Sequence, residues 1–144
     1  MPTPAKLERI VTLFGGAPKD LRLQALLEYA RKVPPLPPDL AAHKEAMERV
    51  PECQTAFFLC AQVDGEDRVH LHFDCPPEAP TTRGFAGILA EGLDGATRDE
   101  VLGVPDDFYD RMGLGEVISH QRLRGMGAIL ARLKRQVREA RPAA

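Results

Sequence analysis

Cysteine side chains offer the clearest nucleophilic chemistry in this 144-residue sequence, which contains Cys53, Cys60 and Cys75. Cys53 lies in the segment Val50–Thr55 (VPECQT), between an expected helix and an expected strand, where a rigid scaffold can present a side chain to a reactant. Cys60 falls inside that strand and is better explained by packing. Cys75 follows the next strand and could be reactive or simply occupy a turn. Cys53 is therefore the leading candidate for chemistry.

A cysteine attacks through its thiolate, and nearby cations raise the thiolate population. Arg83 and Arg122 are the candidates for such cations, although the sequence does not reveal their distance from Cys53. Cys53 could equally be a small buried apolar residue, as many free cysteines are. The residues alone leave both interpretations open.

Two further patterns could bind a ligand, but both signals are weak. His70, His72 and Asp74 share one face of a strand, so a metal ion could bind there. Alternating polar residues on a half-solvated strand give the same pattern, and no Cys-x-x-Cys or His-Glu-x-x-His motif accompanies it. Gly84-x-x-Gly87 lacks the preceding strand and the third glycine of a dinucleotide fingerprint. We therefore expect neither a metal nor a nucleotide site.

Hydrophobic periodicity predicts the elements that must position these residues. From Val69 apolar and polar residues alternate, which is typical of a strand with one buried face; its expected antiparallel partner is Thr55–Val63, joined by a turn at 64–67. Helical spacing predicts helices over about residues 4–14, 18–33, 39–49, 81–93, 97–104, 108–112 and 119–138. Their expected N-caps include Asp39, Thr81 or Thr82, Thr97 and Ser119.

These elements predict an α+β fold in a single domain over residues 1–144, with a small antiparallel sheet and helices packed on one face. A hairpin alone is marginally stable, so a third strand is expected, at a position that the sequence does not reveal. With 44% apolar and 28% charged residues, the chain can bury a core and is not of the disordered class.

Charge and hydropathy argue against some classes of partner. The net charge of −2 provides no general attraction to nucleic acid. Arg132, Lys134, Arg135 and Arg138 are expected mostly on the outer side of the last helix, and they suit its negative end. No apolar run approaches the roughly 20 residues that span a bilayer, and Met1–Glu8 does not resemble a signal peptide. We therefore expect a cytoplasmic protein with reduced cysteines that binds neither nucleic acid nor membrane.

The order of these features resembles the SufE family of sulfur-acceptor proteins over nearly the whole chain. Val50–Thr55 looks like the family's Val-x-Gly-Cys-Gln-Ser segment, with Glu52 in place of the glycine. Ser119–Met126 (SHQRLRGM) is similar to the Ser/Thr-x-x-Arg-x-x-Gly-Leu/Met start of the family's final helix. Glu52 removes backbone freedom beside Cys53, and its negative charge discourages formation of the thiolate.

The resemblance implies that Cys53 accepts sulfur from a cysteine desulfurase, stimulates that enzyme and passes the sulfur to an iron–sulfur cluster scaffold complex. It implies that Arg122 and Asp74 orient the cysteine loop or the docking surface, with Arg83 as a further supporting residue. Pyridoxal phosphate belongs to the desulfurase, so this chain is expected to need no cofactor or metal and to be a monomer or weak homodimer. A persulfide needs shelter, so Cys53 is expected to be partly buried at rest and to move outward on docking.

Two other functions remain open from the sequence. Cys53, Cys75 and a histidine could hold an iron–sulfur cluster, which would make the chain a cluster scaffold. Alternatively, Cys53 and Cys75 could form a disulfide in a thiol redox protein.

Overall fold

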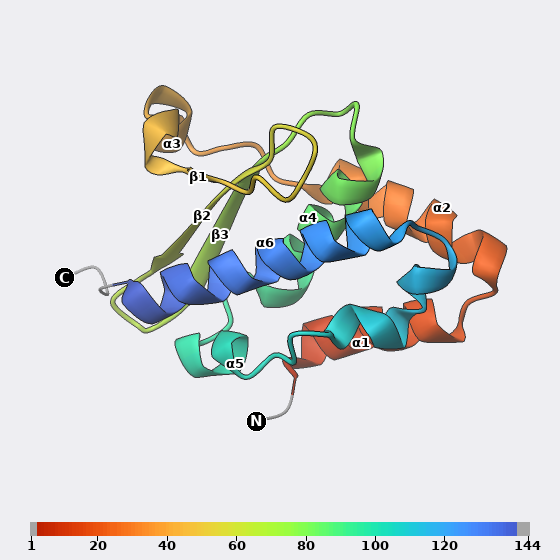
Figure 1. The fold of residues 1–144 in the computed structure, drawn as a ribbon. Helices are drawn as coiled ribbons and strands as arrows, with labels where there is room; N and C mark the ends of the chain where they lie inside the picture. Colours follow the sequence, from red (N-terminus) through yellow and green to blue (C-terminus); the bar gives the residue numbers. More distant parts are fainter. Residues whose placement is uncertain (1–2, 141–144) are drawn as a thin grey trace.

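The computed structural model describes residues 3–140 and combines helices with a small sheet (Figure 1). The strands are β1 (Glu48–Arg49), β2 (Phe58–Val63) and β3 (Val69–Asp74). The α-helices are α1 (Ala5–Gly16), α2 (Lys19–Tyr29), α3 (Pro38–Ala42), α4 (Pro80–Leu93), α5 (Arg98–Leu102) and α6 (His120–Glu139). The 3₁₀ helices are η1 (Ala30–Lys32), η2 (Lys44–Ala46), η3 (Phe108–Met112) and η4 (Leu114–Glu116).

The three strands form an antiparallel sheet in the order β1-β2-β3. β2 and β3 pair over their whole length, beginning with Phe58 opposite Asp74. In the turn between them, the Asp64 carboxylate accepts hydrogen bonds from two backbone N–H groups, as expected of aspartate in a turn. The predicted α+β class and the predicted hairpin are confirmed.

One face of the sheet packs on helices α4 and α6 (Figure 1). The buried side chains of this face alternate along β2 and β3 and are Leu59, Ala61, Val63, Val69, Leu71 and Phe73. α6 runs along β2, whereas α4 packs against β3 and also against α1, α2 and η1. α4 is therefore the central helix of the core. α6 packs on the sheet and also contacts η4, the 3₁₀ helix that precedes it.

The third strand occupies residues for which the sequence predicts a helix. The predicted helix over 39–49 ends at Ala42, and Glu48 and Arg49 form β1 opposite Leu59 and Phe58. The prediction of one continuous helix is wrong beyond Ala42, where the 3₁₀ helix η2 and then β1 follow. Pairing with β2 outweighs the good helix propensity of residues 44–49.

The helix caps are confirmed at two of the four predicted places. Thr97 forms a full capping box with Glu100, and the Ser119 hydroxyl accepts from the backbone N–H of Arg122 at the start of α6. α3 and α4 begin instead at a proline, whose missing N–H makes it suitable for the first turn, and neither helix has a side-chain cap. Thr81 is consequently free to serve another contact.

The C-terminal half of α6 is less exposed than its basic composition suggests. The sequence predicts Lys134 on the outside, yet it is buried and donates to the Val104 carbonyl and, at 2.7 Å, to Asp106 Oδ1. Those acceptors satisfy an ammonium group that would otherwise be costly to bury. Within residues 3–140, no helix has the length and hydropathy needed to cross a bilayer.

Candidate functional site

Cys53 lies on the loop that connects β1 to β2. Val50 and Phe57 are buried and close the base of this loop, with the Val50 N–H donating to the Phe57 carbonyl at 2.9 Å. Within the loop, the Cys53 N–H donates to the Val50 carbonyl at 3.1 Å. The sheet thus fixes both ends of the loop, while its tip makes few backbone hydrogen bonds that would resist displacement.

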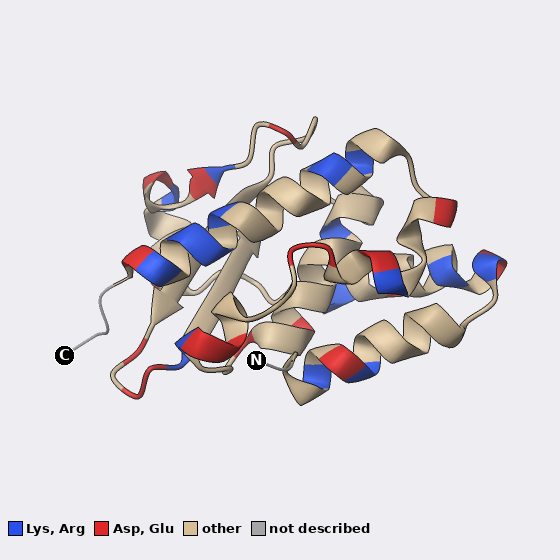
Figure 2. Cartoon of the chain, turned by 60° about the horizontal axis from the view of Figure 1, so that its bottom comes forward, with Lys and Arg blue, Asp and Glu red and all other residues tan. Residues whose placement is uncertain are grey.

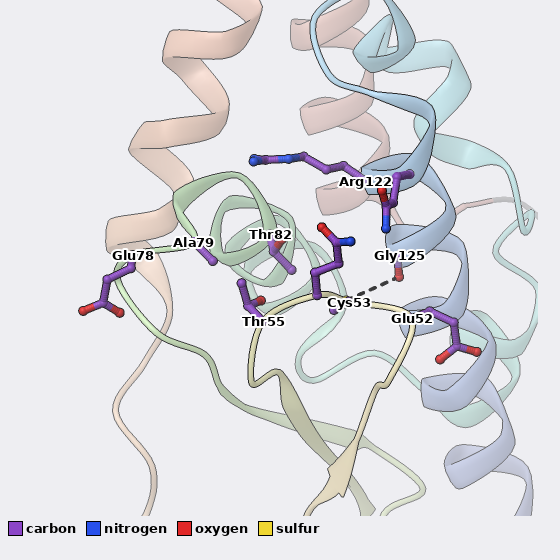
Figure 3. Close-up of a pocket in the computed structure, with 10 residues that line it drawn as sticks. Glu52, Cys53, Thr55, Glu78, Ala79, Thr82, Arg122 and Gly125 are labelled. Atoms are coloured by element: carbon purple, nitrogen blue, oxygen red, sulfur yellow. Dashed lines mark hydrogen bonds between the residues drawn. The ribbon is translucent and has the colours of Figure 1, made fainter.

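The sulfur of Cys53 faces the N-terminal half of α6. Cys53 is 6% exposed, and its Sγ lies 3.9 Å from the carbonyl oxygen of Gly125, to which the thiol can donate a weak hydrogen bond (Figure 3). A Cβ atom at Gly125 would lie only 3.3 Å from this sulfur. Glycine at this position therefore allows the loop to approach the helix backbone closely.

A small pocket of about 110 Å³ adjoins the Cys53 side chain. It lies between the Cys53 loop, the start of α4 and the start of α6, and its lining includes Thr55, Thr82, Gln121 and Arg122 (Figure 3). A water molecule takes about 30 Å³ of liquid volume, so the pocket is large enough for an additional sulfur atom on Cys53. The buried Thr55 hydroxyl has no hydrogen-bond partner within residues 3–140.

The environment of Cys53 disfavours the thiolate in this closed arrangement. The pKa of Cys53 is raised to about 11, chiefly by burial and in smaller part by the negative charge of Glu52 and the proximity of Cys75. Arg132, on α6, acts in the opposite direction. At neutral pH the resting thiol is therefore protonated and a poor nucleophile.

We expect the Cys53 thiol to titrate with a midpoint near pH 11 in the folded protein, well above the value of about 8.5 for a free cysteine. Between those pH values the unfolded chain releases a proton that the folded chain keeps, so the stabilisation linked to this buried thiol is lost as the pH rises. Thiolate absorbance measures the midpoint, with a Cys60→Ser/Cys75→Ser chain compared against the same chain also carrying Cys53→Ser. A midpoint near the free value would contradict this burial.

Of the three predicted supporting residues, Arg122 lies nearest to the Cys53 chemistry. It lines the pocket, and its Nη1 donates to the Thr81 hydroxyl at 2.8 Å, which joins the start of α6 to the start of α4. Thr81, predicted as a possible N-cap, is thus the partner of Arg122. This contact places a guanidinium beside the pocket without bringing it onto the sulfur.

Arg83 and Asp74 lie beside Cys75 and not in the Cys53 pocket. Arg83 donates to the carbonyl of Ala30 at 2.9 Å and to the carbonyl of Cys75 at 2.7 Å, so it connects η1 to the segment after β3. Asp74 forms an ion pair with Lys44 at 3.3 Å. Their observed contacts hold the segments around the site together.

The two strand histidines have partners on the sheet face that points away from the core. His70 lies 2.7 Å from Asp64 Oδ2, and His72 lies 3.2 Å from Gln62 Oε1. No group of three or more His, Cys, Asp or Glu side chains with metal-binding geometry occurs in the part of the chain from residue 3 to residue 140. All three cysteines are free thiols, with Cys75 buried and Cys60 half-buried.

The sequence interpretation missed one charged residue at the site, Arg132. Helical spacing alone puts it on the outer side of the last helix, yet it contacts Glu52, the residue before Cys53. The signal that could have found Arg132 is its distance along the helix from Gly125, because residues about two turns apart lie on the same face of α6.

Comparisons with known proteins agree with this architecture. The SufE family, described as an Fe-S metabolism associated domain, matches residues 8–137. An uncharacterized SufE-like protein of Mycobacterium tuberculosis is 51% identical over 137 residues, which cover 95% of this chain and 94% of that protein. The cysteine desulfuration protein SufE of Plasmodium vivax is 26% identical over 132 residues, which cover 90% of this chain and 51% of that protein.

A solved structure also matches this fold over almost the whole chain. The solution structure of a hypothetical protein from Thermus thermophilus has a TM-score of 0.85 and 50% sequence identity, and the match covers 96% of this chain and 98% of that one. Family, relatives and fold thus agree over almost the whole length. The chain belongs to the SufE family, whose domain is associated with iron–sulfur metabolism.

Proposed function

We propose that this protein accepts sulfur on Cys53 from the persulfide of a cysteine desulfurase and delivers it to an iron–sulfur cluster scaffold. One observation supports the proposal most directly: Cys53 is on a loop, buried beside a pocket of about 110 Å³ that has room for a second sulfur atom. Membership of the SufE family supplies the class of reaction. A relative named a cysteine desulfuration protein supports the desulfurase as the donor.

The transfer step resembles thiol–disulfide exchange. The Cys53 thiolate attacks the outer sulfur of the donor persulfide, and a new S–S bond forms on Cys53. The S–S bond of the donor breaks, and its inner sulfur leaves with the bonding electron pair as a thiolate. The proton lost by the Cys53 thiol balances the one taken up by that leaving thiolate or by solvent. No external oxidant or reductant is needed, because the outer sulfur keeps its oxidation state.

The closed loop cannot carry out this attack as it stands. Cys53 is 6% exposed, its sulfur faces Gly125, and its pKa is about 11. Docking of the donor must therefore displace the loop, which would expose the sulfur and restore a more ordinary thiol pKa. Return of the loop would then shelter the persulfide in the pocket. Access to Cys53 in this mechanism is controlled by a loop movement.

The proposal is tested by incubating the purified protein with a cysteine desulfurase and cysteine, followed by trapping of persulfides and peptide mapping. We expect a single added sulfur atom on Cys53 and faster turnover of cysteine by the desulfurase. Absence of any adduct with every desulfurase of the source cell would contradict the proposal. The pyridoxal phosphate in this assay is carried by the desulfurase.

A further inference from the structure

The residue before Cys53 is tied to α6 by a guanidinium. Arg132 Nη2 donates to both carboxylate oxygens of Glu52, at 2.9 and 3.1 Å. Arg132 Nη1 donates to Glu48 Oε2, in β1, at 2.8 Å. One side chain of α6 therefore bridges the strand that enters the loop and the tip of the loop itself.

The strand side of this bridge is firmly held. Glu48 also accepts from Arg135 and, at 2.9 Å, from Gln136 Nε2. Gln136 Oε1 in turn accepts from the backbone N–H of Ala61 in β2 at 2.8 Å. Figure 2 shows the acidic residue of β1 beside the basic C-terminal half of α6. Arg132 thus has a fixed position against the sheet, so its bond to Glu52 restrains the loop and not the helix.

The loop touches α6 at two places on one helix face. Sγ of Cys53 rests on the Gly125 carbonyl at 3.9 Å, a distance typical of a weak sulfur contact. About two turns further along, the Glu52 carboxylate makes a charge-assisted contact with Arg132. The ion pair is the stronger polar connection between the loop tip and the helix.

We infer that the Glu52–Arg132 ion pair is a latch that holds the Cys53 loop closed and sets how often the thiol becomes accessible. The inference deepens the proposed function and rests on it, because sulfur transfer needs the loop to open. Glu52 and Arg132 are positioning residues, which control access to the sulfur through the loop backbone.

A purely electrostatic role for the same charges predicts a different result. The Glu52 charge raises the pKa of Cys53 and the Arg132 charge lowers it. If charge alone mattered, neutralising Glu52 would make the thiol more reactive and neutralising Arg132 would make it less reactive. A latch predicts that either substitution makes Cys53 more reactive. The sign of the Arg132 effect therefore distinguishes the two roles.

The test measures alkylation of Cys53 by iodoacetamide, mapped by tandem mass spectrometry, at reagent concentrations where the rate reports the open fraction of the loop. The stabilisation by an exposed ion pair is largest when two hydrogen bonds join the partners, as they do here. Glu52→Gln and Arg132→Gln should therefore each accelerate alkylation of Cys53 about threefold to fivefold. The double variant should react no faster than the faster single variant. Arg135→Gln removes a contact to Glu48 but none to Glu52, so Cys53 in this variant should be alkylated at close to the rate of the original protein.

Cys75 is the internal reference, because it is buried but is not in the Cys53 loop. Slower or unchanged alkylation of Cys53 in Arg132→Gln would overturn the latch, as would a proportional increase at Cys75, which signals opening of the whole domain. Added salt should accelerate the alkylation of Cys53 in the original protein but not in Glu52→Gln, since salt screens the ion pair. Equal salt effects on the two proteins would also contradict the latch. No desulfurase is present, so these outcomes are separate from those that test sulfur acceptance.

Discussion

Cys53→Ser should reduce the sulfur accepted from a cysteine desulfurase to the background level. A serine hydroxyl does not become an anion near neutral pH and cannot form the S–S bond on which the transfer depends. Serine is close to cysteine in size, and the position adjoins a pocket of about 110 Å³, so the fold should tolerate the change. The measurement is transfer of labelled sulfur from cysteine, through the desulfurase, to the purified protein.

Cys60→Ser and Cys75→Ser are the matched controls. Cys60 is half-buried in β2, and Cys75 is buried next to Arg83. Neither adjoins the pocket at Cys53, so both variants should accept sulfur as the original protein does. Undiminished labelling of Cys53→Ser would remove Cys53 from the mechanism. Loss of labelling in Cys75→Ser alone would assign the acceptor role to Cys75.

The same protein distinguishes sulfur acceptance from the two other functions that the sequence left open. A redox role for Cys53 and Cys75 requires a disulfide between them after mild peroxide, whereas sulfur carriage requires one added sulfur on Cys53 after treatment with desulfurase. A scaffold role requires visible absorbance after anaerobic loading with iron and sulfide. Mass spectrometry and absorbance therefore give a different positive signal for each function.

Periodicity is a good guide to the elements with one buried face. The alternation after Val69 predicts β3 and its pairing with β2, and the helical spacing after Ser119 predicts α6. These predictions succeed because burial of a repeating apolar face dominates the choice of local structure. The sequence does not reveal β1, because this strand has two residues, Glu48 and Arg49, and is stabilised by a distant strand and by α6.

The site is predictable only in part for a similar reason. Cys53 stands out by its sequence context, and its loop position follows from the elements on either side of it. The contacts of Arg132 and Arg122 join segments far apart in the chain, so residue type and spacing do not reveal them. Glu52 is expected to disfavour the thiolate through its charge, and the structure agrees. Its partner on α6 becomes visible only in the structure.

Two glycines in α4 have a structural role. The Gly84-x-x-Gly87 pair lies where α4 crosses α2, and both glycines face backbone atoms of that helix. A Cβ at Gly84 would lie 2.9 Å from Leu26 Cδ1 and closer still to the Leu26 carbonyl oxygen. A Cβ at Gly87 would lie 2.8 Å from the Tyr29 carbonyl carbon, again with the oxygen closer. Small residues here permit backbone contact between the helices.

Gly87→Ala should therefore destabilise the protein strongly, although alanine is the better helix former. Helix propensity favours alanine by about 1 kcal/mol in a helix interior. The added methyl group would meet backbone atoms that cannot rotate away, and overpacking of this kind costs about 3 kcal/mol or more. The steric cost exceeds the gain in propensity, so the net free energy of unfolding should fall by about 2 kcal/mol. Urea unfolding followed by circular dichroism measures this change.

Gly16→Ala provides the matched control in the same class of substitution. Gly16 is the last residue of α1, and a Cβ there meets no atom within 4 Å. Its effect on the free energy of unfolding should stay within about 0.5 kcal/mol. Equal stability of the two variants would mean that α2 and α4 can separate without cost. Because α4 also packs against β3, such freedom would loosen the sheet that fixes both ends of the Cys53 loop.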